Sequence, residues 1–174
     1  REYLVTNAHV VAGASTIRAS LGGDVLDATP VLFDPVLDVA VLHVPGLDGQ
    51  LLRFAAADPE RGDQGVVLGF AGGSTMVVLP AAVSGAYPAT GRDIYDGTRV
   101  TRDILELRAA IEPGDSGGPL ILEDGTVGGL VFAESRTDDT IGYALTPTVV
   151  ATRIAPAIGR TGAVFEALVP AILE

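Results

Sequence analysis

Residues 114–119 read Gly-Asp-Ser-Gly-Gly-Pro and are the segment of this chain that points most clearly to chemistry. They directly follow a strand-like run over residues 104–111. A serine between glycines on a tight turn can present its hydroxyl group and several backbone N–H groups to a substrate carbonyl. Donors fixed in advance stabilise the oxyanion that develops during acyl transfer. The segment therefore predicts Ser116 as a nucleophile.

A serine nucleophile needs a base, and the chain contains two histidines. His43 ends a run of strand-forming residues, and a single histidine in such a strand is more often structural, so we expect that role for it. His9 lies where an apolar strand gives way to small residues. Its block, Thr-Asn-Ala-His-Val-Val, is followed by Asp-Val-Ala-Val-Leu at residues 38–42 and then by the serine segment. The order His, Asp, Ser favours His9 as the base.

This ordered set resembles the trypsin-like serine proteases, in particular the bacterial branch of HtrA-type proteases and the actinobacterial MarP-type acid-resistance periplasmic proteases. The likeness covers roughly residues 4–147 and includes the spacing between the three blocks. Other matching segments are Val-Leu-Gly-Phe at 67–70 and Val-Thr-Arg-Asp at 100–103.

The resemblance implies a role for each residue of the set. Ser116 attacks the scissile carbonyl, His9 takes its proton, and Asp38 orients the imidazole. The N–H groups of Gly114 and Ser116 form the oxyanion hole. Asp115 is expected to shape the turn through local hydrogen bonds rather than to act in catalysis.

Two carboxylates compete for the role of orienting the histidine, because Asp34 and Asp38 lie close together in the sequence. We choose Asp38 because it adjoins the Val-Ala-Val-Leu strand, as in the family pattern. Asp34 precedes a proline, and an Asp-Pro pair is typical of a turn.

The resemblance also locates the primary substrate pocket. Ala110 stands where trypsin has the aspartate that binds basic side chains, and it is followed by Ile111. The opposite wall is expected to be Leu130, Val131, Phe132 and Ala133. An uncharged pocket of this kind favours an apolar or small P1 residue, unless Glu134 points into it.

Short runs rich in Val, Ile and Thr, separated by Gly, Pro and Asp-Gly, predict an all-β fold. With the resemblance, we expect two antiparallel six-stranded β-barrels of the chymotrypsin type and a short C-terminal helix. Residues 1–62 would form the first half with His9 and Asp38, and residues 63–147 the second half with Ser116. The active site would lie in the cleft between the halves.

Residues 148–174 are expected to form the C-terminal helix and an apolar tail. Helical spacing of Val149, Val150, Ile154 and Ile158 predicts the helix over 148–158. The tail either packs on the barrel or binds a partner. Residues 88–103 are polar and turn-rich, which predicts a surface loop near the cleft. The Asp138-Asp139 pair is expected at the tip of a hairpin.

The net charge of −11, without a basic cluster, argues against nucleic acid and anionic membranes as partners. The chain has no cysteine, which excludes disulfides and thiolate metal sites, and no apolar run is long enough to span a bilayer. The glycine-rich stretch 69–73 fits no nucleotide-binding pattern. We expect no cofactor and no metal, and a protein or peptide substrate as the partner. The oligomeric state stays open.

The chain begins within the strand that delivers His9, whereas the family has further strands upstream. We therefore expect an incomplete first barrel and a longer, membrane-anchored parent in the periplasm or cell envelope. Two hypotheses follow: a serine endopeptidase of stress or acid resistance, or a catalytically silent peptide-binding module or inactive fragment of such a protease. An α/β-hydrolase esterase is disfavoured because its triad would run Ser, Asp, His.

Overall fold

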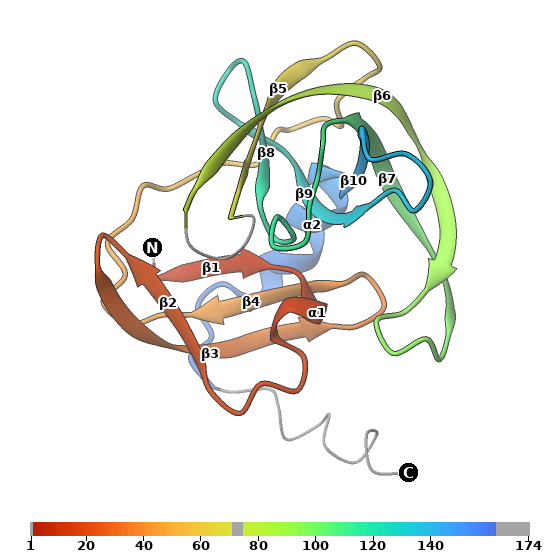
Figure 1. The fold of residues 1–174 in the computed structure, drawn as a ribbon. Coiled ribbons are helices and arrows are strands. Elements are labelled where there is room, and N and C mark those ends of the chain that lie inside the picture. Colours follow the sequence, from red (N-terminus) through yellow and green to blue (C-terminus); the bar gives the residue numbers. More distant parts are fainter. Residues whose placement is uncertain (1, 71–74, 163–174) are drawn as a thin grey trace.

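The computed structural model describes residues 2–70 and 75–162, and this part of the chain forms two antiparallel sheets with short helical segments (Figure 1). The predicted all-β fold with a short C-terminal helix is confirmed. The strands are β1 (Tyr3–Thr6), β2 (Ile17–Leu21), β3 (Asp24–Asp34), β4 (Val39–His43), β5 (Gln64–Gly69), β6 (Val77–Arg92), β7 (Arg99–Arg108), β8 (Pro119–Leu122), β9 (Val127–Glu134) and β10 (Ile141–Leu145). The helical segments are α1 (Ala8–Val11), α2 (Pro147–Ile154) and the 3-10 turn η2 (Ala155–Ala157).

The second half is a closed antiparallel barrel with the strand order β10-β7-β6-β5-β8-β9. Its interior is filled by apolar side chains such as Val67, Leu105, Leu107 and Val131, all fully buried. Strand β5 lies so close to β8 that a Cβ atom at Gly65 would be 2.2 Å from the carbonyl oxygen of Ile121. The predicted six-stranded barrel is confirmed for this half.

The first half is a four-stranded sheet with the order β1-β4-β3-β2. Strand β4 is buried on both faces, which explains its continuous apolar sequence. Val39 and Val41 face the core shared with the barrel, whereas Ala40 and Leu42 face a separate core within the first half. In the described residues this sheet is open, in line with the incomplete barrel that the resemblance implied.

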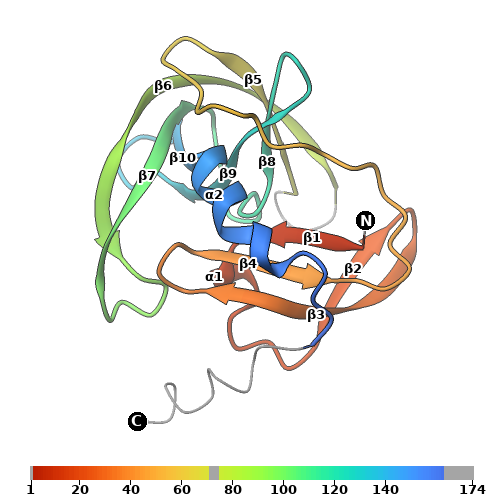
Figure 2. The ribbon, with the colours of Figure 1, turned by 180° about the vertical axis from the view of Figure 1, so that it is seen from behind.

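Helix α2 lies behind the junction of the two halves, where Figure 2 shows it crossing from the barrel to the first sheet. Val150 and Ile154 enter the shared core together with Val41 of the first sheet and Leu130 of the barrel. Ile158, which was expected on the same apolar face, is 53% exposed. Helix α2 ends at Ile154 and is followed by the 3-10 turn η2, so residue 158 lies beyond the helix and off its apolar face. The helix nevertheless ties both halves together.

The stretch 88–103 is not a loop, and this sequence expectation was wrong. Strands β6 and β7 continue through it as a long hairpin whose pairing runs to Arg92 opposite Arg99. The tip is closed by Asp93, whose carboxylate accepts hydrogen bonds from the backbone N–H groups of Tyr95, Gly97 and Thr98. Cross-strand pairing and this side-chain cap outweigh the turn-rich composition that suggested a loop.

Residues 44–63 contain no strand and connect β4 to β5, although Phe54 forms an isolated bridge with Val127 of the barrel. We propose the division into 1–62, 63–147 and 148–174 on this basis. The tail from residue 163 and part of the glycine-rich stretch, residues 71–74, lie outside the described residues. Within residues 2–70 and 75–162, the helices are too short to cross a membrane.

An ion pair fastens α2 to the first sheet, because Arg153 Nε donates a hydrogen bond to Asp34 Oδ2 at the end of β3. Burial alone would raise the pKa of Asp34. The hydrogen bond and charge of Arg153, with the N–H groups of Leu37 and Val36, instead hold this pKa below its ordinary value of 3.8. The ionised form is therefore favoured in the folded chain.

We expect Asp34→Asn to lower the free energy of unfolding at pH 7 by about 1–3 kcal/mol, the usual effect of losing hydrogen bonds to a charged group. Because the folded pKa is lowered, this contribution is complete above pH 3.8 and disappears as the pH falls through the folded value. Denaturant unfolding of both proteins should give a constant difference between pH 7 and about pH 5. A difference that grows toward acid pH would contradict this assignment.

Candidate active site

Asp38 lies at the end of a tight turn between β3 and β4. The carboxylate of Asp34 builds this turn, because its Oδ1 accepts hydrogen bonds from the N–H groups of Val36 and Leu37, each at 2.9 Å. The N–H of Asp38 in turn donates to the carbonyl of Asp34 at 2.9 Å. Asp38 has a φ of 67°, in the left-handed region that costs a residue other than glycine some strain. Asp34 is thus the turn residue that its Asp-Pro sequence predicts.

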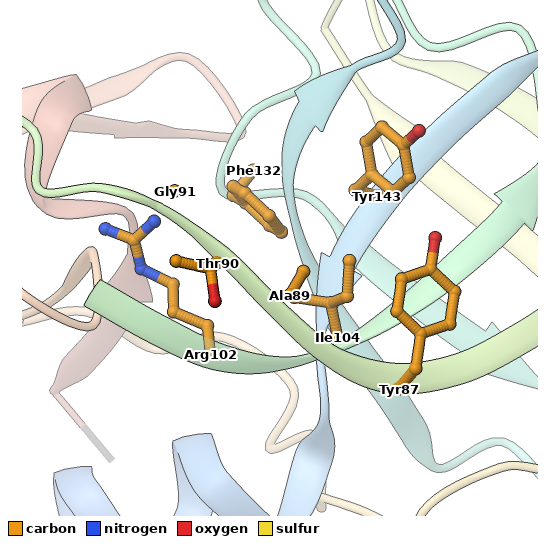
Figure 3. Close-up of a pocket in the computed structure, with 8 residues that line it drawn as sticks. All are labelled: Tyr87, Ala89, Thr90, Gly91, Arg102, Ile104, Phe132 and Tyr143. Carbon is orange, nitrogen blue, oxygen red and sulfur yellow. The ribbon is translucent and has the colours of Figure 1, made fainter. Parts of the chain in front are cut away.

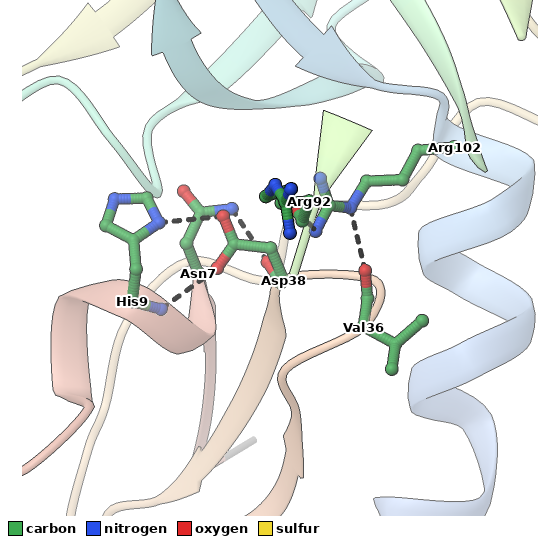
Figure 4. A network of polar contacts seen from close by, with 6 residues as sticks. All are labelled: Asn7, His9, Val36, Asp38, Arg92 and Arg102. Atoms are coloured by element: carbon green, nitrogen blue, oxygen red, sulfur yellow. Dashed lines mark hydrogen bonds and ion pairs between the residues drawn. The ribbon is translucent and has the colours of Figure 1, made fainter. Parts of the chain in front are cut away.

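His9 holds the Asp38 carboxylate with two hydrogen bonds (Figure 4). The backbone N–H of His9 donates to Oδ1 at 2.9 Å, and the ring Nδ1 lies 2.7 Å from Oδ2. Asp38 itself is only 4% exposed. The His9 backbone donor is available because it lies in the first turn of α1, where N–H groups lack partners within the helix.

The carboxylate decides which ring nitrogen carries the proton. An ionised carboxylate only accepts hydrogen bonds, so the neutral imidazole of His9 places its proton on Nδ1, facing Asp38. Nε2 is then left as a proton acceptor. Asn7 adds a third contact, because its fully buried side chain donates from Nδ2 to the Asp38 carbonyl at 2.9 Å.

The Gly-Asp-Ser-Gly-Gly-Pro segment forms a compact turn after β7. Asp115 closes it twice: its N–H donates to the carbonyl of Glu112 at 3.0 Å, and its Oδ2 accepts the N–H of Glu112 at 2.9 Å. Gly117 N–H donates to the carbonyl of Val131 in β9. Within the described residues, the N–H groups of Gly114 and Ser116 have no hydrogen-bond partner. The turn therefore leaves free the two donors that an oxyanion hole requires.

Glycines allow this turn to approach both halves closely. A Cβ atom at Gly117 would lie 2.4 Å from Oγ1 of Thr6, which stands next to Asn7 at the end of β1. A Cβ atom at Gly69 would lie 2.0 Å from Oδ1 of the buried Asp115. The first contact brings the Ser116 turn against the segment that carries His9. The described residues contain no hydrogen bond between the Ser116 hydroxyl and His9; such bonds are often long before substrate binds.

The residues of the expected P1 pocket do not all remain accessible. Strand β9 has a core on each face, so the side chains of Leu130 and Val131 are buried in them and cannot line a pocket. Ile111 is 5% exposed and lies over Gly142, where a Cβ atom would be 2.2 Å from its Cγ1. The strand after Val131 is more open, and this leaves Phe132 and Ala133 partly exposed. Ala110 is exposed as well.

Glu134, which would complicate an apolar pocket, is exposed at the end of β9. His43 lies at the opposite end of β4 from Asp38 and packs on Tyr3, with ring centroids 5.3 Å apart. Asp138 accepts hydrogen bonds from Thr140 in the turn before β10. The structure thus places these three residues in surface or structural surroundings.

Phe132 also lines a cavity of about 240 Å³ that the sequence did not predict (Figure 3). The cavity is formed by the β6–β7 hairpin together with β9 and β10. Its lining residues are Tyr87, Ala89, Thr90, Gly91, Arg102, Ile104, Phe132 and Tyr143. Burial and a hydrogen bond to Glu106 raise the pKa of Tyr87 to about 12. This cavity was missed because half of its residues come from the stretch interpreted as a loop.

The fold and these residues define a class of protein, and the sequence model of the trypsin-like peptidase domain matches residues 1–130. The chain belongs to the trypsin-like peptidase family. Serine protease Rv3671c of Mycobacterium tuberculosis is 44% identical over 159 residues, which are 91% of this chain and 40% of that protein. A probable periplasmic serine endoprotease, DegP-like, of Chlamydia pneumoniae is 32% identical over 180 residues, 99% of this chain and 35% of that protein. The chain thus spans about two fifths or less of these relatives.

Solved structures show the same relationship. The crystal structure of the Rv3671c protease in its active form matches with a TM-score of 0.90 and 43% identity, covering 94% of this chain and 72% of that one. The HtrA-type protease AlgW with a decapeptide matches with a TM-score of 0.77 and 30% identity, covering 90% and 48%. The predicted resemblance to trypsin-like and HtrA-type proteases is confirmed.

Proposed function

We propose that this chain is the protease domain of a serine endopeptidase that uses His9, Asp38 and Ser116. One observation carries the proposal: His9 holds Asp38 with two hydrogen bonds and keeps Nε2 as an acceptor, beside a turn with two free N–H donors. The names of the relatives, all serine proteases, support the same activity.

In the proposed reaction, Ser116 Oγ attacks the carbonyl carbon of a peptide bond while His9 Nε2 takes its proton. The negative oxygen of the tetrahedral intermediate accepts hydrogen bonds from the N–H groups of Gly114 and Ser116. The intermediate then collapses: His9 gives its proton to the leaving amine, the C–N bond breaks, and the acyl group stays on Ser116 as an acyl-enzyme. A water molecule, deprotonated by His9, attacks this acyl-enzyme in the same way and releases the carboxylic acid and free Ser116. Asp38 stabilises the imidazolium throughout.

We further propose a location outside the cytoplasm, in the periplasm or cell envelope. The name of the DegP-like relative from Chlamydia pneumoniae, which includes the word periplasmic, supports this location. A membrane anchor and a role in stress or acid resistance, both implied by the resemblance, belong to the same proposal. Cell fractionation tests the location.

A fluorophosphonate probe should label the wild-type chain covalently at Ser116. Labelling should be absent in Ser116→Ala and greatly slowed in His9→Ala, because the serine then lacks its base. Ser135→Ala, which removes a partly buried serine after β9, is the matched control and should label normally. Gel fluorescence and mass spectrometry of the labelled peptide measure both outcomes.

Labelling that survives Ser116→Ala would refute the assignment of the nucleophile. If the folded wild-type chain binds peptides but takes no label, the catalytically silent module is the correct alternative.

The P1 preference should be for apolar or small residues, because Ala110 and Ile111 offer no charge to a basic side chain. Ile111 also fills the space over Gly142. A peptide series varied only at P1 should therefore give higher kcat/KM for Ala, Val or Leu than for Arg or Lys. Preferred cleavage after Arg or Lys would contradict this pocket and would point to Glu134 as its acid.

A further inference from the structure

Arg102, which lines the cavity beside Phe132, has contacts that reach beyond the barrel. It lies on β7, and its guanidinium donates from Nε to the carbonyl of Val36 at 2.8 Å and from Nη2 to the carbonyl of Arg92 at 3.1 Å. Val36 is in the turn that presents Asp38, and Arg92 ends β6 at the tip of the hairpin. One planar side chain thus connects the hairpin tip to the Asp38 turn (Figure 4).

A second hydrogen bond joins the same two parts, because the N–H of Ile94 donates to the carbonyl of Pro35 at 3.3 Å. The hairpin tip is itself held by internal hydrogen bonds: Asp93 caps it, and Arg92 Nη1 donates to the carbonyl of Asp96 at 2.9 Å. Two successive carbonyls of the Asp38 turn are therefore satisfied by residues of the second half rather than by the first sheet.

The charge of Arg102 suits this position. The side chain is half-buried, and this burial lowers its pKa, whereas the nearby carboxylates of Asp38, Asp93 and Asp34 favour its charged form. Its forked donors can bond two carbonyls at once, which a lysine ammonium does with less geometric control. A guanidinium is thus matched both to the carbonyls and to the acidic surroundings of the turn.

We propose that Arg102 is a positioning residue for the catalytic machinery: it holds the Asp38 turn in register with the half that carries Ser116. The inference rests on the proposed function. Strand β7 carries Arg102 near its start and leads from its end into the Ser116 turn. Asp38 has a left-handed backbone that depends on its surroundings. Without the bond to Val36, the turn is free to shift, and Asp38 no longer fixes the His9 ring.

The test compares Arg102→Gln with Arg99→Gln, which removes the same charge from an exposed position on the same strand. Arg102→Gln should lower kcat by about 10- to 100-fold, since a shift of about 1 Å in a catalytic group has effects of this size. KM should change little, because no contact with bound substrate is lost. Arg99→Gln should behave as wild type. Arg102→Lys, which keeps the charge and most of the stem, should recover part of kcat.

A spectroscopic measurement makes the test independent of peptidase activity. With only two histidines in the chain, ¹⁵N-histidine labelling assigns the downfield proton of the His9–Asp38 hydrogen bond, and His43→Gln identifies the other ring. The His9 proton should be sharp in wild type and Arg99→Gln, and lost or broadened in Arg102→Gln. If wild type shows this proton but cleaves nothing, the proposed function fails while the positioning role is still decided by the spectra.

The proposal is overturned if folded Arg102→Gln keeps both the His9 proton and kcat, even when its melting temperature falls, since that pattern means a purely structural role. It is also overturned if only KM rises. Should Arg102→Gln fail to fold, Arg102→Lys decides by the same two readouts: an unchanged proton and unchanged kcat would refute the need for the forked donor.

Discussion

The geometry of the candidate site depends on the pair of hydrogen bonds from His9 to the Asp38 carboxylate. A carboxylate that is 4% exposed is costly to bury unless its oxygens have partners, and both oxygens have one here. The bonds fix the histidine tautomer and the ring orientation together. The surrounding contacts serve this geometry: Asn7 holds the Asp38 carbonyl, Asp34 builds the turn, and Arg153 anchors Asp34 to α2.

The site also requires that the two sheets lie in a fixed position relative to each other. The first sheet provides His9 and Asp38, and the closed barrel provides Ser116. Their junction contains a continuous apolar core, into which Val41, Leu130 and Val150 pack from the sheet, the barrel and the helix. Close approach of Gly117 to Thr6 brings the Ser116 turn onto the segment before His9. The Arg102 contacts add polar links at the opposite side of the Asp38 turn, so that this turn is held from both halves.

The sequence predicts the all-β class, α2 and Asp34 as a turn residue, because each has a local signature in residue type and spacing. The closed barrel was expected from the family resemblance. Three features had no such signature. Helix α1 is four residues long, too short for a helical period, although it supplies the N–H that binds Asp38. The hairpin of β6 and β7 is made by cross-strand pairing and by the Asp93 cap at its tip, which composition does not reveal. The burial of Leu130 and Val131 follows from cores on both faces of β9, and only the tertiary packing shows it. The triad and its pocket are predictions from the family pattern, and their test is kinetic.

The most direct measurement is the kcat of Asp38→Asn beside that of Asp34→Asn on one peptide substrate. An asparagine at position 38 keeps the shape of the carboxylate but offers an amide to His9, which favours the wrong tautomer. We predict a loss of about 10⁴-fold in kcat for Asp38→Asn with the fold intact. Asp34→Asn should lose far less activity, because Asp34 only shapes the turn. A larger loss in Asp34→Asn than in Asp38→Asn would contradict the assignment of Asp38 as the residue that orients His9.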